Sequence, residues 1–121
     1  MNCDDITSTD PTVFTVQVSV NTLGKPVCTP NPVLVTAANA LLVFKLDVDG
    51  YEFPASGAVV VSSPGDDFPY PCWQINKHTA ALFDAADDQI SYDYTVTVVN
   101  STTGERHSVD PAIDNRNTGG D

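Results

Sequence analysis

The stretch that decides the fold lies near the end of the chain, where 88–100 reads DQISYDYTVTVVN, 101–104 reads STTG and 105–115 reads ERHSVDPAIDN. Apolar and aromatic residues take alternate positions in its first part: Tyr92, Tyr94, Val96 and Val98. Because successive side chains of a β-strand point to opposite faces, this alternation predicts one apolar face and one solvated face. The polar loop that ends in Gly104 predicts a turn into a second strand. Such a hairpin buries its apolar face only against another sheet, which predicts a β-sandwich.

The rest of the chain repeats this period-two pattern in short segments separated by Pro, Gly and Asp. Further strands are predicted at 13–20, 33–36, 40–48, 57–62, 73–77 and 79–84. The segment 40–48 is apolar on both faces at its start, which predicts a central strand. Short strands with turn residues roughly every 8–12 positions are typical of immunoglobulin-like domains. We therefore expect an all-β chain that folds as an immunoglobulin-like antiparallel β-sandwich of about seven strands.

The segment 88–92, DQISY, supports this class. Immunoglobulin-type domains often carry an Asp, a small apolar residue and a Tyr just before and into their sixth strand, and the Tyr hydroxyl bonds back across the corner. Tyr92 is therefore expected to be a structural residue of a corner or of the core. Tyr94 stands where an antibody domain has its second Cys, so no disulfide between the sheets is expected.

The length of 121 residues predicts one domain. A chain of this size buries roughly two thirds of the surface of its unfolded form and needs no metal or disulfide to fold. We expect a flexible N-terminal segment at 1–10, a single β-sandwich domain at 11–116 and a frayed tail at 117–121.

The chain is strongly acidic, with 16 Asp and Glu against 5 Lys and Arg and a net charge of −11. Nucleic acids and anionic membranes attract basic proteins, because Lys and Arg displace counterions from phosphate. The composition therefore argues against nucleic acid and membrane as partners. It fits a cation-binding protein or the partner of a basic protein.

The start of the chain, MNCDD, lacks the basic residues and the apolar run of a secretory signal. No apolar run is long enough to span a bilayer. If Met1 is the native start, we expect a cytoplasmic protein. Cys3, Cys28 and Cys72 form an odd and widely spaced set, which predicts no disulfide framework.

Acidic loops make calcium the one cofactor to consider, since hard cations take oxygen ligands from flexible loops. The candidate ligands are Asp47, Asp49, Asp66 and Asp67. The alternative is that Asp49 and the glycine after it form a hairpin turn and the other carboxylates are solvated. Blue copper is excluded because the only Met is Met1 and no Cys lies near His107. A structural zinc site is excluded because no close Cys or His pair is present.

No catalytic motif is found, so we expect no catalytic residues. A Gly-x-Ser-x-Gly nucleophile elbow is missing, and alternation on a strand places His107 and Ser108 on opposite faces. The remaining cue for binding is a set of aromatic residues interleaved with Pro: Tyr51, Phe68, Tyr70 and Trp73. Such a segment is either a recognition surface for peptide or sugar or a cap over one end of the sandwich.

The segment 109–115, VDPAIDN, follows the strand 92–98, YDYTVTV, and together they resemble the ending of a group of small bacterial proteins of the DP-EP type. Related Asp-Pro-x-Ile endings occur in the bacterial inclusion-body protein family. The resemblance implies a bacterial β-sandwich with no known activity, so it assigns no functional residue. Asp110 and Pro111 are expected to end the last strand, because Pro cannot donate to a ladder.

We therefore expect a non-catalytic bacterial β-sandwich protein that acts in protein interaction or self-association, with a homo-oligomer as one outcome. The alternative is a calcium- or carbohydrate-binding module that uses the acidic and aromatic loops. Convergence of the four candidate aspartates at one end of the sandwich would favour that alternative. An enzyme is the third hypothesis, which a deep pocket with His78 or His107 beside a buried carboxylate would favour.

Overall fold

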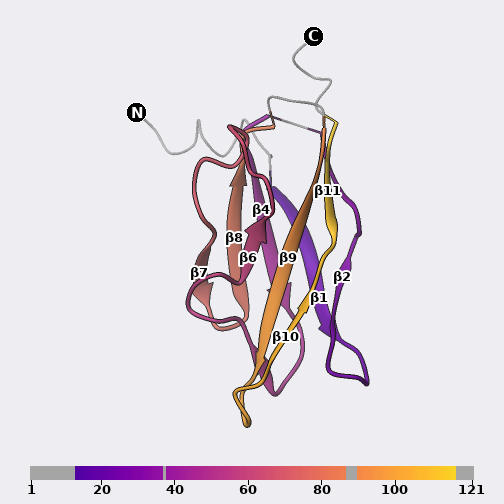
Figure 1. The fold of residues 1–121 in the computed structure, drawn as a ribbon, viewed down its shortest axis with the longest axis vertical. Helices are drawn as coiled ribbons and strands as arrows, with labels where there is room; N and C mark the ends of the chain where they lie inside the picture. The colour runs from indigo at the N-terminus through magenta and orange to yellow at the C-terminus, as the bar shows by residue number, and fades with distance from the viewer. Residues whose placement is uncertain (1–12, 37, 87–89, 117–121) are drawn as a thin grey trace.

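Two β-sheets pack face to face in the computed structural model, which describes residues 13–36, 38–86 and 90–116 (Figure 1). These residues form eleven strands, and none of them belongs to a helix with the length and apolar character that crossing a bilayer requires. The first sheet has five strands in the order β2-β1-β4-β8-β7. Its strands are β1 (Val13–Val20), β2 (Pro26–Thr29), β4 (Ala40–Leu46), β7 (Trp73–Asn76) and β8 (Thr79–Asp84).

The second sheet has six strands and is built around β9 (Ser91–Asn100), which pairs with four others. β10 (Arg106–Val109) and β11 (Ala112–Asn115) pair with one side of β9, and β3 (Val33–Val35) continues the sheet beyond β11. β5 (Tyr51–Glu52) and β6 (Val59–Val61) pair with the other side of β9. The most strongly alternating stretch of the sequence is thus the centre of a sheet.

The predicted C-terminal hairpin is present and keeps one register along its whole length. Val99 faces Arg106 near the turn, and Ser91 faces Asp114 at the far end. Gly104 closes the turn with a φ of +77°, a backbone conformation that glycine adopts without steric cost.

The expectation that Asp110 and Pro111 end the last strand is wrong. Pro111 has no N–H to donate, but its carbonyl accepts a hydrogen bond of 3.0 Å from the N–H of Tyr94. Pairing with β9 resumes at Ala112 without a change of register. The proline therefore interrupts the ladder and does not terminate it.

Two ladders are parallel, so the prediction of an antiparallel sandwich is wrong for them: β1 pairs with β4, and β3 pairs with β11. After the β1–β2 hairpin the chain crosses into the second sheet as β3 and returns to the first as β4. This route makes β4 run in the same direction as β1. Asn31 stabilises the crossing, because its Oδ1 accepts a hydrogen bond of 3.0 Å from the N–H of Ala112.

The six strands predicted outside the hairpin are all present, with bounds within two residues of the predicted ones. The described residues nevertheless form eleven strands and not about seven. β2 begins with Pro26 and β5 has only two residues, and the period-two pattern reveals neither of them. The division of the last strand into β10 and β11 adds another.

The inward faces of the two sheets form one apolar core. On β4 every second side chain is buried, from Ala40 to Leu46. The ring of Phe44 packs against the ring of Tyr94 in the facing sheet, with 5.6 Å between their centroids. Each large apolar side chain buried in this way contributes about 1.5–3 kcal/mol. The described cysteines, Cys28 and Cys72, form no disulfide.

Candidate functional site

The outer face of the five-stranded sheet is apolar over part of its length. Strand alternation turns two rows of side chains outward, and the registers of the ladders set them side by side. The first row is Val13, Leu41 and Phe83, and the second is Thr15, Val43, Ala81 and Trp73. The ring of Tyr70 lies 5.9 Å from the ring of Phe83 and extends the first row. We name these two rows, together with Tyr70, the apolar face.

Several large side chains of the apolar face are open to solvent. Val13 is 56% exposed, Tyr70 61% and Trp73 45%. The next row along the sheet is polar and places Gln17, Lys45 and Thr79 in register. A contiguous apolar surface with a polar border is typical of a site of protein–protein contact.

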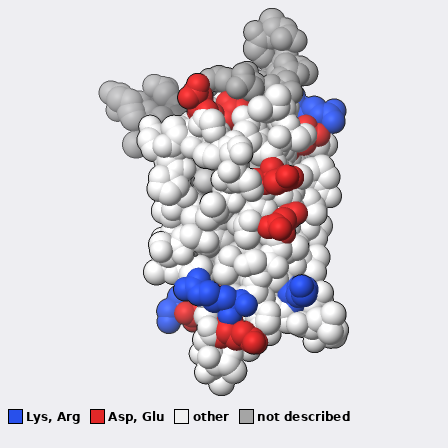
Figure 2. Space-filling model, viewed as in Figure 1, with Lys and Arg blue, Asp and Glu red and all other residues white. Residues whose placement is uncertain are grey.

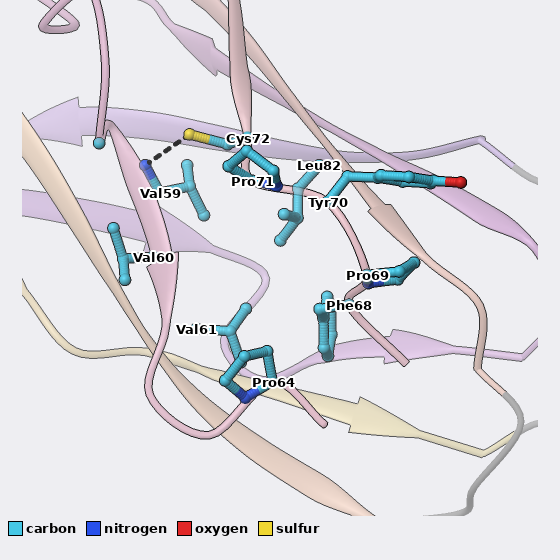
Figure 3. A pocket seen from close by; sticks show the side chains of 11 residues that line it. Val59, Val60, Val61, Pro64, Phe68, Pro69, Tyr70, Pro71, Cys72 and Leu82 are labelled. Carbon is cyan, nitrogen blue, oxygen red and sulfur yellow. Dashed lines mark hydrogen bonds between the residues drawn. The ribbon is translucent and has the colours of Figure 1, made fainter. Parts of the chain in front are cut away.

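A small pocket opens between β6 and the loop that leads to β7 (Figure 3). Its volume is about 210 Å³, and its walls are aliphatic, aromatic and proline side chains, among them Val61, Phe68 and Tyr70. The Sγ of Cys72 accepts a hydrogen bond of 3.3 Å from the N–H of Val59, which ties the loop to β6. Ligand pockets usually enclose about 300–1,000 Å³, so this one suits only a small apolar group.

The four aromatic residues predicted as a binding surface lie in three different places. Phe68 is buried, and its ring contacts Tyr92 with 4.9 Å between centroids. Tyr70 and Trp73 are exposed and belong to the apolar face. Tyr51 lies in β5, where its ring contacts His107. The burial of Phe68 fits the cap interpretation, and for the exposed Tyr70 and Trp73 a role in recognition stays a prediction.

The four aspartates predicted as calcium ligands do not converge. Asp47 and Asp49 are exposed in the turn after β4, and Asp66 is exposed in the loop between β6 and β7. Asp67 is buried close to Asp84. Asp84 pairs with Ala40 at the start of β4, whereas Asp47 follows the end of β4, so the length of β4 separates Asp67 from Asp47. Within 13–36, 38–86 and 90–116, no three His, Cys, Asp or Glu side chains are grouped to hold a metal ion.

Buried polar side chains from several elements meet around Asp67. The Nδ2 of Asn115 donates to Oδ2 of Asp67 at 3.2 Å and to Oδ1 of Asp84 at 3.1 Å. The hydroxyl of Tyr92 donates to Oδ2 of Asp67 at 2.8 Å, and the N–H of Ala86 donates to Oδ1 of Asp84 at 2.9 Å. Asp67, Asp84 and Asn115 are each 0% exposed. We name Asp67, Asp84, Tyr92 and Asn115 the buried polar cluster.

One carboxyl group of the buried polar cluster, that of Asp84, has a raised pKa. Burial raises the pKa of Asp84 from 3.8 to about 6; hydrogen bonds from Asn115 and Ala86 oppose this rise, and the charge of Asp67 adds to it. Among the described residues, Oδ2 of Asp84 and Oδ1 of Asn115 have no hydrogen-bond partner. Two buried oxygen atoms are therefore left with unused lone pairs.

Asp84 and Asn115 are candidates that the sequence pattern did not reveal. Their signal is position: Asp84 follows Ala80 and Leu82 on the inward face of β8, and Asn115 follows Ile113 on the inward face of β11. A carboxylate at an inward position of a strand needs a partner in the core, which marks such a residue for attention.

The histidines do not form the pocket that would favour an enzyme. His78 lines an open hollow of about 390 Å³ with Asp47, and both side chains are exposed. His107 contacts Oε1 of Glu105 at 3.1 Å. Burial raises the pKa of the Cys28 thiol to about 11, and a hydrogen bond with Tyr94 opposes this rise.

Charged side chains are unevenly distributed over the face of the molecule drawn in Figure 2. Acidic side chains lie in its middle and at its upper end, and basic ones lie near its lower end and at its upper right, in part beside acidic ones. Basic residues that stand singly along the sequence are thus partly grouped in space. On this face they form no extended basic stripe of the kind that binds nucleic acid.

Comparison with known protein families finds no matching family model, and comparison with curated proteins finds no match. The resemblance to DP-EP type proteins therefore stays a prediction, and function has to be argued from the geometry.

Proposed function

We propose that this protein is a non-catalytic module that associates with a second copy of itself through the apolar face. The observation that carries the proposal is the outward pair Leu41 and Val43 on β4. This strand is apolar on both faces, which is the pattern of a strand covered on both sides. In the single chain, however, Trp73, which lies in the same outward row as Val43, remains 45% exposed. Covering apolar surface is favourable by about 25 cal/mol per Å², so a partner on this face would stabilise it.

A second copy is the partner that the charges favour. The chain has a net charge of −11, so most contacts between two copies would bring acidic side chains together. The apolar face contains no Asp, Glu, Lys or Arg, so two copies meet there without apposing like charges. A two-fold symmetric contact also lets one patch serve both copies.

Val43→Lys tests the proposal, because it places a charge within the apolar face without touching the core. Analytical ultracentrifugation of the wild-type chain is expected to show a dimer at high protein concentration, and the variant is expected to be a monomer. Val60→Lys is the matched control, since Val60 is 52% exposed on β6 of the other sheet. The control is expected to dimerise like the wild type. A wild-type monomer at every soluble concentration, or a Val43→Lys dimer of unchanged affinity, would overturn the proposal.

We also propose that the sandwich is of the immunoglobulin-like class and that the chain is related to DP-EP type proteins. Two packed sheets and the position of Tyr92 near the start of the central strand support the class. The parallel ladders of β1 and β3 distinguish the chain from the all-antiparallel form. Binding of carbohydrate has weaker support, because the pocket of about 210 Å³ is mostly apolar and small.

A further inference from the structure

The turn between β1 and β2 presents an apolar side chain to solvent on a closed backbone. Leu23 is 77% exposed, the highest fraction among the large apolar residues that the structure describes. Asn21 closes the turn, because its Oδ1 accepts hydrogen bonds from the N–H of Leu23 at 2.9 Å and from the N–H of Lys25 at 3.0 Å. The N–H of Asn21 also donates to the carbonyl of Lys25 at 2.9 Å. A leucine held out from such a turn is preorganised for contact, because little backbone freedom is left to lose on binding.

The pocket between β6 and the loop that leads to β7 has room for such a side chain. Its volume is about 210 Å³, and the side chains of Val61, Phe68 and Leu82 surround it (Figure 3). An apolar cavity of about 150 Å³ is enough to bind benzene, so the isobutyl group of a leucine fits here. Among the described residues, none of those that line the pocket is charged, so the group that enters it has to be apolar.

The other exposed large apolar side chains are less suited to enter a pocket. Most of them stand on the paired strands β1, β2, β3, β6 and β7, where neighbouring side chains limit how far they project. Of those outside strands, Tyr70 packs on Phe83, and Ile90 lies beside β11, since its carbonyl accepts a hydrogen bond from the N–H of Asn115. Leu23 is the one that projects from the tip of a hairpin turn.

The turn and the pocket lie at opposite edges of the sandwich. β2 and β7 are the outer strands of the first sheet, so four strand spacings of about 4.8 Å separate the β1–β2 turn from the loop before β7 (Figure 1). Leu23 therefore does not reach the pocket of its own chain, and a contact between them joins two copies. Because the two surfaces differ, the contact is heterologous and joins copies head to tail.

The distribution of charge favours this contact. The end of the molecule that carries the turn is neutral, although the chain has a net charge of −11. The 4 basic and 4 acidic residues near this end are Lys25, Lys45, Lys77, Arg106, Asp47, Asp49, Glu52 and Glu105. The loop that forms the pocket is acidic, because Asp66 is exposed between the lining residues Pro64 and Phe68. Lys25, which is exposed two positions after Leu23, thus brings opposite charge to that loop.

We propose that the pocket binds Leu23 of a second copy of this chain. The contact is separate from the apolar face, since Tyr70 is the one residue that the described lining shares with that face. A single anchoring side chain gives a weak contact. It therefore adds to the proposed dimer only at high protein concentration and leaves the Val43→Lys variant monomeric in dilute solution.

NMR titration of two full-length variants, each of which keeps one half of the contact, tests the proposal. Both carry Val43→Lys, which removes association through the apolar face. The ¹⁵N-labelled chain also carries Leu23→Asp and keeps the pocket, and the unlabelled chain carries Val61→Phe, which fills the pocket, and keeps Leu23. We expect the amide signals of Val61 and Phe68 in the labelled chain to shift as the unlabelled chain is added up to about 1 mM. If Val61→Phe does not fold, unlabelled Val43→Lys takes its place, because the labelled chain still offers only its pocket.

Two leucine variants of the unlabelled chain identify the group that enters the pocket. Leu23→Asp in the unlabelled chain is expected to weaken binding by about 10-fold or more, because the burial of a leucine side chain is lost. Leu34→Asp is the matched control, since Leu34 is 50% exposed on β3, and it is expected to leave binding unchanged.

Two results would overturn the contact. The signals of the pocket could stay in place with about 1 mM of the unlabelled chain. They could also shift equally when the unlabelled chain carries Leu23→Asp, which would assign the binding to another surface. Failure of the proposed dimer is read separately, as sedimentation of a Val43→Lys chain that still dimerises.

Discussion

The hydroxyl of Tyr92 donates a hydrogen bond of 2.8 Å to Oδ2 of Asp67, and both side chains are buried. The bond connects β9, the central strand of the second sheet, to the loop between β6 and β7. The ring of Tyr92 also packs edge-on against Phe68, the next residue of that loop, with 4.9 Å between centroids. One side chain thus holds the loop by a polar and an apolar contact, and the small pocket that the loop forms depends on both.

Tyr92→Phe keeps the ring contact with Phe68 and removes only the hydroxyl. Hydrogen bonds to charged groups contribute about 1.5–3 kcal/mol, so we expect the free energy of unfolding to fall by that amount. Urea denaturation followed by circular dichroism measures this loss. Tyr51→Phe, on the half-buried strand β5, is the control and is expected to change stability by less than about 0.5 kcal/mol. Equal losses in the two variants would contradict the role assigned to the hydroxyl.

Asp84 makes the stability of the fold depend on pH. Burial is the main cause that raises its pKa from 3.8 to about 6. The folded chain therefore binds this proton more tightly than the unfolded chain. Its contribution to stability is full below pH 3.8 and is lost as the pH rises through about 6.

The difference between the wild type and Asp84→Asn isolates this contribution from the other carboxylates of the chain. Tyr92, Asn115 and Asp67 face Asp84 in both proteins, so their effects largely cancel. We expect the stability of the wild type relative to the variant to fall steadily between pH 3.8 and about 6, measured by urea denaturation. Parallel curves over that interval would show that Asp84 does not titrate there.

Phe44→Ala removes an aromatic contact between the two sheets. Phe44 is fully buried and packs against Tyr94. Replacing a buried Phe by Ala costs about 3–5 kcal/mol, because the lost burial adds to the cavity that remains. Leu34→Ala on β3 is the control, since Leu34 is 50% exposed, and it is expected to cost less than about 0.5 kcal/mol. Urea denaturation of both variants decides whether the packed sheets share one core.

The strands were predictable because alternation is a local property of the sequence. Tyr92 to Val98 predicts the strand that proves central to the second sheet, and the polar turn at Gly104 predicts its partner. Whether two paired strands run parallel or antiparallel is not set by the local sequence. The alternation of β1 and β4 is the same for a parallel and an antiparallel pair, and the crossing at Asn31 is held by Ala112, 81 positions away.

The candidate sites likewise differ in how much of each could be predicted from the local sequence. Tyr70 and Trp73 were predicted as binding residues from their type and their neighbours. The apolar face also needs Leu41 and Val43, and the sequence places these in a strand buried on both sides, because it cannot show that one side lacks a cover. The buried polar cluster joins Asp67 to Asn115, 48 positions apart, and no spacing rule connects them.

The close approach of Gly24 to the ring of His107 can be tested by comparing alanine substitutions at Gly24 and Gly57. Both have positive φ, +81° and +73°, so alanine at either position suffers the cost of a left-handed backbone, about 1–2 kcal/mol. A Cβ at Gly24 would also lie 3.3 Å from Cε1 of His107, whereas a Cβ at Gly57 would meet nothing within 4 Å. We therefore expect Gly24→Ala to destabilise the chain more than Gly57→Ala in urea denaturation. The excess is expected to disappear when His107→Ala is added, because the ring that the new methyl group crowds is then absent. An excess that persists without His107 would assign the cost to the turn itself.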